Sequence, residues 1–282
     1  MLDHIRELMA PPAGMAFDFA EPRGEPALVP ADSISWAIFR NPVTLFVGGV
    51  AAVVLELAEP SVRTGVWEHS SFRRDPVGRL KRTGFAAMMT VYGPRSAAEA
   101  MIAHVVAMHD RVRGETPDGV PYHANDVRLL DWVQATASFG FIHAYSAYAR
   151  PLDPREVSQA FAEGAEAARL YGATGAPTSA EDWEAMLAAT LPALEESPIL
   201  HEFLAMMGEA PLLPRAMRPV QKMLVRAAVD LVPVEVRARI GLGGALHGLS
   251  AVDRKVVKVM AWAAEHAPMP GTPPAEAARR LS

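Results

Sequence analysis

The apolar stretch VTLFVGGVAAVVLE, residues 43–56, decides the fold class of this chain. Only Thr44 and two glycines interrupt it before Glu56 closes it. Its 13 residues before Glu56 are fewer than the ~20 that a helix needs to cross a bilayer, so the stretch predicts a helix buried in a protein core. We expect no transmembrane segment. The first 20 residues also lack the basic region and apolar run of a signal peptide.

The sequence around this stretch also predicts helices. Asp153 and Pro154 combine a helix cap with a first-turn proline, and Ser250 opens a last long helix that ends near His266. In residues 125–141, an Asn-Asp cap precedes apolar residues at i, i+3 and i+4 spacing. No stretch alternates apolar and polar residues with β-branched enrichment. We therefore expect an all-α protein, a single multi-helix domain with essentially no sheet.

Breaks in the helical pattern divide the chain into three segments. Residues 1–33 are rich in Pro, Gly and acidic residues around one short predicted helix, residues 2–9, and are interpreted as an N-terminal arm. Residues 34–266 carry the long helices and form the predicted domain. The Pro-rich residues 267–282 are expected to form a frayed, flexible tail.

The composition excludes several classes of partner and site. The chain has 282 residues, with 27 Lys and Arg against 32 Asp and Glu, and a net charge of −5 argues against a nucleic-acid partner. Hydrophobic residues make up 50% of it, enough for a large core. There is no cysteine, which excludes disulfides, thiolate catalysis, iron–sulfur clusters and cysteine zinc sites. A cytoplasmic location is expected.

Two histidines lie on one predicted helix, residues 97–112. His109 shares an apolar stripe with Met101 and Val105 and is expected to point inward. His104 lies roughly 140° away around the helix, so the two are not expected to bind one metal. Two interpretations of His109 remain open. It is either a core histidine satisfied by a backbone carbonyl or an axial ligand of a haem iron in an apolar, Met-rich pocket.

A second candidate group surrounds Arg79. Arg79 and Thr83 are i, i+4 neighbours, and Thr83 falls on an apolar stripe of the same predicted helix. Arg79 is interpreted either as an anchor for a carboxylate, such as a haem propionate, or as a surface residue paired with Asp75 or Glu99. Gln134 also falls on an apolar stripe, where its amide needs partners in a polar pocket or on another helix.

An ordered set of short motifs along the chain resembles a known family. These motifs are Glu59-Pro60, Trp67-Glu68-His69, Asp75-Pro76 with Arg79 and Thr83, His109-Asp110-Arg111, Tyr122-His123-Ala124-Asn125-Asp126 and Arg150-Pro151. Over residues 34–246 the chain resembles the domain shared by the rubber oxygenases (latex-clearing proteins) and the MpaB-type oxygenases of fungal meroterpenoid synthesis. The resemblance implies an all-helical fold with a globin-like core that holds haem b. It also implies oxidative cleavage of an isoprenoid double bond with dioxygen.

The resemblance also assigns roles to individual residues. It makes His109 the proximal iron ligand and places Arg79 and Thr83 near the haem. Arg82 stands where latex-clearing proteins have a lysine that can cap the iron, and a guanidinium stays protonated and cannot ligate. Gln134 stands where many relatives have a histidine. If that histidine were the ligand in this branch, this chain would have lost haem.

Together these patterns predict a haem b-dependent oxygenase that acts on a small apolar, isoprenoid-like substrate with dioxygen. Arg79 would fix a propionate or polarise bound oxygen. Glu68, the acid nearest the Arg79 segment, would accept a proton from the substrate in an apolar pocket opposite His109. The alternative for Glu68 is a structural role, either as a cap of the next helix or in a surface pair with Arg73 or Arg74. The alternatives for the chain are a haem-free helical protein that binds an apolar ligand, and a haem carrier or sensor without oxygenase activity.

Overall fold

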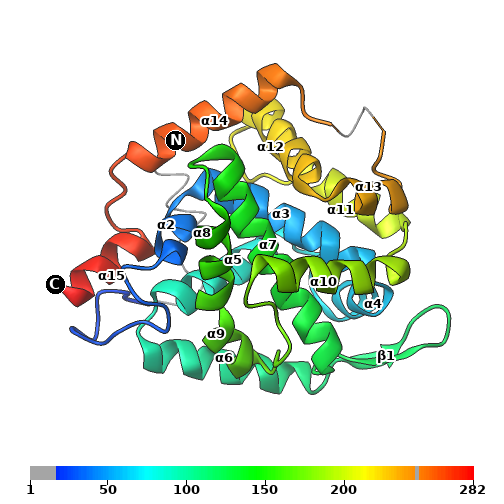
Figure 1. Cartoon of the computed structure of the whole chain (residues 1–282), viewed down its shortest axis with the longest axis horizontal. Coiled ribbons are helices and arrows are strands. Elements are labelled where there is room, and N and C mark those ends of the chain that lie inside the picture. Colours follow the sequence, from blue (N-terminus) through cyan, green and yellow to red (C-terminus); the bar gives the residue numbers. More distant parts are fainter. Residues whose placement is uncertain (1–16, 245–247) are drawn as a thin grey trace.

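Residues 43–56 lie within helix α3 (Pro42–Ala58), which runs through the centre of the molecule (Figure 1). Asn41 caps this helix, because its side-chain oxygen accepts hydrogen bonds from the backbone N–H groups of Val43 and Thr44. Most side chains of α3 are buried. The predicted core helix is therefore confirmed.

Helix α7 (Val127–Tyr148) packs along α3 because two glycines let the backbones approach closely. A Cβ atom on Gly48 would lie 2.6 Å from the carbonyl oxygen of Gly140, and a Cβ atom on Gly140 would collide with the carbonyl oxygen of Gly48. Trp132 ties the pair together further along, since its indole N–H donates to the Leu55 carbonyl at 3.2 Å. This helix pair forms the centre of the core.

The structure is a computed structural model that describes residues 17–244 and 248–282, and helices dominate it. The all-α prediction is confirmed. The predicted helix at residues 2–9 lies outside the described residues. The other α-helices are α2 (Ile34–Arg40), α4 (Pro60–His69), α5 (Pro76–Tyr92), α6 (Arg95–His109), α8 (Pro154–Glu163), α9 (Ala165–Tyr171), α10 (Ala180–Thr190), α11 (Pro198–Glu209), α12 (Arg218–Leu231), α13 (Val234–Arg239), α14 (Ala251–His266) and α15 (Pro273–Leu281), with 3₁₀ turns η1 (Leu191–Ala193) and η2 (Arg215–Met217).

Within the described residues, no single helix is both long and apolar enough to span a membrane. Helices α2 and α3 are long and apolar enough only when they are taken together, and the chain bends by 96° between them.

A short antiparallel hairpin between α6 and α7 was not expected from the sequence. Strands β1 (Arg113–Glu115) and β2 (Pro121–His123) pair with Gly114 opposite Tyr122, and the hairpin projects from the helical body (Figure 1). Gly119 takes a positive φ in the turn that joins them. Strands of three residues are too short for an alternating pattern to show in the sequence.

The C-terminal residues are packed, and the expectation of a frayed tail is wrong for them. Helix α15 packs against α5, and Ala277 and Arg280 on α15 are buried. The guanidinium of Arg280 donates to the backbone carbonyls of Phe19 at 2.6 Å and of Glu25 and Tyr92 at 2.8 Å. These acceptors belong to segments distant in sequence, so the local Pro-rich composition could not reveal them.

The apolar interior is divided into two main clusters. The larger one is built on α3, α7 and the helices from α10 to α14. The second is built on α5, α6, α15 and the segment around Phe19. The candidate site is built on helices of both clusters.

Candidate functional site

Partly accessible side chains occur on helices that belong to both apolar clusters. On α3 these are Gly49, Val53 and Glu56, which lie on one face of an otherwise buried helix. A Cβ atom on Gly49 would lie 3.8 Å from the ring of Phe141, so this face meets α7. Because protein interiors are close-packed, we infer that these partly accessible faces border an internal space. Partly accessible residues at four-residue spacing also occur on α6 and α7, namely Met101, Val105, His109, Val133, Ala137 and Phe141.

Glu56 in the last turn of α3 is the enclosed acid of this region. Burial raises the pKa of its carboxyl to about 7, against an opposing effect of the nearby Arg79 guanidinium. We did not expect Glu56 in the site from the sequence. The available signal was a lone acid at the end of a long apolar run, on the same helical face as Gly49 and Val53.

Arg79 lies in the first turns of α5, which Asp75 caps by accepting from the Gly78 N–H at 2.8 Å. Its Nε atom is buried and has no hydrogen-bond partner among the described residues. Burial lowers the pKa of Arg79, while the Glu56 carboxylate raises it. A buried N–H without an acceptor is costly, so this guanidinium is suited to bind an anionic group that enters the internal space.

The surface pairing considered for Arg79 is not what the structure shows. Asp75 pairs instead with Arg82 at 3.5 Å, and Glu99 pairs with Arg95 at 3.4 Å. Both acids that could have held Arg79 at the surface thus have other partners.

His109 is the last residue of α6, and its Nδ1 atom is buried without a hydrogen-bond partner in the described part of the chain. Burial and the charge of Arg79 lower its pKa, while the neighbouring Asn125 amide raises it. The Asn125 Nδ2 group donates to the Val106 carbonyl at 3.1 Å and to Asp110 at 2.6 Å. Its Oδ1 is buried and lacks a partner, so Asn125 offers a fixed acceptor beside the imidazole.

Two other predicted residues of α5 lie on the surface. Thr83 is exposed, and its hydroxyl donates to the Arg79 carbonyl at 3.0 Å. Arg82 is also exposed and donates to the Ser71 hydroxyl at 2.6 Å. The structure therefore brings Arg79 to Glu56 and His109 but does not bring Thr83 or Arg82 with it.

Glu68 is exposed next to the end of α4, and its expected place in an apolar pocket is wrong. Its negative charge contributes to the raised pKa of Tyr122 on the hairpin. Arg73, one of its possible surface partners, pairs with Glu202 at 3.5 Å. The prediction rested on the closeness of Glu68 to Arg79 in sequence, which does not determine that the last turn of α4 faces solvent. The enclosed carboxyl is that of Glu56.

Gln134 and His143 are the remaining polar residues of interest on α7. Gln134 is half-buried and neighbours Val133 and Ala137 on the helix surface. His143 stacks on Phe139 with ring centroids 4.2 Å apart, its Nδ1 lies 3.0 Å from the Phe139 carbonyl, and burial lowers its pKa. His143 is therefore the core histidine satisfied by a backbone carbonyl, the role first considered for His109.

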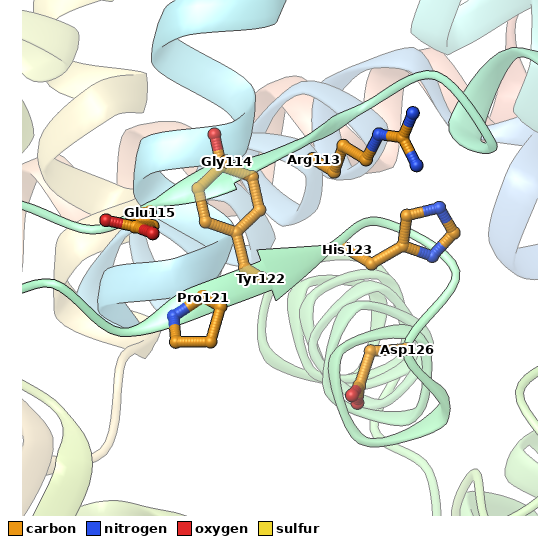
Figure 2. A pocket seen from close by; sticks show the side chains of 7 residues that line it. All are labelled: Arg113, Gly114, Glu115, Pro121, Tyr122, His123 and Asp126. Carbon is orange, nitrogen blue, oxygen red and sulfur yellow. The ribbon is translucent and has the colours of Figure 1, made fainter.

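A separate depression lies on the hairpin. Figure 2 shows Arg113 and His123 extending from adjacent strands, with the Tyr122 ring beside Gly114. A Cβ atom at Gly114 would lie 2.8 Å from the Tyr122 hydroxyl, so glycine makes room for the ring. None of the enclosed groups of the interior lines this depression, and we do not assign the site to it. Its lining is Arg113, Gly114, Glu115, Pro121, Tyr122, His123 and Asp126.

A family model described as the catalytic domain of the ER-bound oxygenase mpaB/B′ and the rubber oxygenases matches residues 36–266. The chain belongs to this oxygenase family. The match covers most of the chain and includes Glu56, Arg79 and His109, and it confirms the resemblance seen in the motifs. No curated protein and no solved structure matches the chain.

The residues of this oxygenase-family chain fit the haem b that the family resemblance implies. A haem iron takes an imidazole ligand, and its propionates take basic partners. His109 and Arg79 supply these groups, each with a buried nitrogen that has no partner among the described residues. Within those residues, no cluster of three or more His, Asp or Glu side chains could hold a metal ion. A single imidazole such as that of His109 is a ligand that a haem iron takes, its other ligands coming from the macrocycle.

Proposed function

We propose that the protein is a haem b-dependent oxygenase that acts on a small apolar, isoprenoid-like substrate with dioxygen. Membership of the oxygenase family supports the reaction class. The observation that carries the cofactor is the pair of buried, unpartnered nitrogens, Arg79 Nε and His109 Nδ1, on elements that face the internal space.

In this proposal each enclosed residue has one role. His109 ligates the iron through its imidazole. Arg79 binds a propionate through a charge-assisted hydrogen bond. When bound, the haem supplies an iron that activates dioxygen. The apolar side chains of α3 and α7, such as Val53 and Phe141, favour a substrate without charged groups.

Glu56 takes the part of the proton acceptor. A carboxyl with a pKa of about 7 is ionised in an appreciable fraction of molecules near neutral pH and is more basic than an exposed glutamate. The positive charge of Arg79 favours its ionised form. Glu56 would remove a proton from the substrate and hold it on its carboxyl oxygen.

The decisive experiment compares two glutamates in haem-loaded protein. Oxygen uptake and product formation would be measured with isoprenoid alkenes for wild type, Glu56→Gln and Glu68→Gln. We expect Glu56→Gln to keep its haem and to lose activity by about 10²-fold or more, and the exposed Glu68→Gln to stay near wild type. Unchanged turnover in Glu56→Gln would refute its role as base.

The same assay separates the proposal from its alternatives. Haem-loaded wild type that consumes no oxygen with any alkene would be a haem carrier or sensor. Wild type that takes up no haem but binds apolar molecules would be a haem-free ligand-binding protein. Gln134 gives this last alternative its weight, because the family resemblance implies a histidine at this position in many members.

A further inference from the structure

Helix α14 carries an apolar stripe that faces solvent. Val252, Val259 and Trp262 are 71%, 64% and 60% exposed, and Val256 is 41% exposed. Residues 252, 256 and 259 recur at three- and four-residue spacing and therefore lie along one face of the helix. In Figure 1, α14 lies along the outer edge of the molecule. Monomeric proteins rarely expose a continuous row of large apolar side chains without a function.

Polar contacts on the opposite side hold this face outward. Val257 and Ala261 are buried against the core. At the C-terminal end, Glu265 accepts hydrogen bonds from Arg40 and Asn41 on the α2–α3 corner. The first turn is held in a similar way by two ion pairs to α12, Arg226–Asp253 at 3.0 Å and Asp230–Arg254 at 2.6 Å. The stripe therefore cannot turn into the protein without breaking these contacts.

Two lysines flank the stripe on the side of Trp262. Lys255 and Lys258 are exposed and stand seven and four residues before Trp262. Neither has an ion-pair partner among the residues that the structure describes. The other charged groups of this helix, including Asp253, are already paired with the protein body. On a chain with a net charge of −5, this helix thus presents a local positive charge beside apolar side chains.

We propose that α14 is an interfacial helix that binds the surface of an anionic lipid bilayer. Val252, Val256, Val259 and Trp262 would insert at the headgroup level, while Lys255 and Lys258 contact anionic headgroups. Tryptophan is enriched at this depth because its ring is apolar and its N–H is polar. A second copy of the chain fits this stripe less well. Stable protein interfaces bury roughly 20–30 residues on each side, far more than one helix face provides.

The position of α14 connects this surface to the interior. Helix α14 packs directly on α3 and α7, the helices whose facing sides border the internal space. Binding of α14 to a bilayer would bring the internal space close to the lipid, in which apolar molecules dissolve. The inference does not depend on haem or on oxygenase activity, so its test uses neither.

The test is sedimentation of the full chain with lipid vesicles. One set contains phosphatidylcholine alone and the other an equimolar mixture with phosphatidylserine. We expect wild type to bind the mixed vesicles. The double variant Val256→Glu/Val259→Glu should bind about tenfold more weakly or worse. The affinity of Lys255→Gln/Lys258→Gln for mixed vesicles should fall by about tenfold or more, given the usual contribution of each basic side chain. Its affinity for neutral vesicles should change little.

A matched control is available on another helix. Val234 on α13 is 69% exposed but is followed by the acidic Glu235, and Val234→Glu should bind vesicles as wild type does. Circular dichroism checks that all variants are folded. The proposal is overturned if wild type binds neither vesicle, or if Val256→Glu/Val259→Glu binds like wild type. It is also overturned if wild type forms a dimer that this variant abolishes, which would make the stripe a self-association surface.

Discussion

Arg79 and Arg82 lie three residues apart on α5, yet their environments are opposite. Arg79 is enclosed with an unpartnered Nε, whereas Arg82 is exposed and bonded to Ser71 and Asp75. We therefore expect Arg79→Ala to weaken haem binding by about tenfold to a hundredfold, because a charge-assisted hydrogen bond contributes about 1.5–3 kcal/mol. Arg82→Ala should have little effect. Haem affinity by absorbance titration measures both, and equal losses would contradict the assignment.

The raised pKa of Glu56 predicts a pH dependence of stability in the haem-free protein. Its carboxyl titrates near pH 7 when folded and near 4.5 when unfolded. Between these values the unfolded state has lost the proton that the folded state keeps, so the free energy of unfolding falls as pH rises. The free energy of unfolding should fall by about 3 kcal/mol in total, and this loss should persist at pH values above 7.

Glu56→Gln removes the titration of this carboxyl. The difference between wild type and the variant therefore separates the effect of Glu56 from that of other titrating groups. Urea unfolding of wild type and Glu56→Gln at pH 5 and pH 8 would measure it. We expect the variant to gain stability relative to wild type at the higher pH. Parallel changes in the two proteins would show that Glu56 is not enclosed.

Single residues of the site differ in how far the sequence could reveal them. Helical spacing predicts that His109 lies on the inward face of its helix, because the periodicity of one helix is enough to assign its faces. Glu56 could not be recognised in this way. An acid that ends an apolar helix can equally face solvent, and both its burial and its closeness to Arg79 are set by tertiary packing. Glu68 was misplaced for the same reason, since the direction of the last turn of α4 is a tertiary property.

Among the elements, the close contact of α3 and α7 is the one most sensitive to a single methyl group. Gly48→Ala would place its Cβ 2.6 Å from the Gly140 carbonyl oxygen and force the helices apart. We expect a loss of about 3 kcal/mol or more, at the upper end of the usual penalties for overpacking.

Gly84→Ala is the matched control for this substitution. A Cβ at Gly84 on α5 would meet nothing within 4 Å, so alanine should stabilise its helix by about 0.5–1 kcal/mol. Thermal or urea unfolding compares the two variants. A Gly48→Ala protein as stable as wild type would contradict the close packing of these helices.

The elements that the sequence predicted are those with strong local signals. Helix α3 has its apolar run, α8 has the Asp153 cap and α14 begins at Ser250 as expected. The hairpin has strands too short to show a pattern. Helix α15 depends on Arg280, whose carbonyl acceptors, Phe19 and Tyr92, lie in the first third of the chain.

At the scale of the whole molecule, the division of the core bears on the proposed haem. The clusters on α3 and α7 and on α5 and α6 are distinct, and partly accessible faces occur on helices of both. Filling an apolar space with a planar, apolar ring would join the two clusters and remove accessible surface from both. We therefore expect haem binding to stabilise the protein as well as to equip it for chemistry.

The central claim is that His109 holds a haem, and haem titration of the purified protein tests it most directly. Haemin would be added to wild type, His109→Ala and His104→Ala, with the Soret band as the readout. His104 is the control, because it lies on the same helix and is exposed. We expect wild type and His104→Ala to bind about one haem per chain with the same spectrum, and His109→Ala to lose the Soret band while keeping its helical circular dichroism. Full haem occupancy with an unchanged spectrum in His109→Ala would contradict the claim.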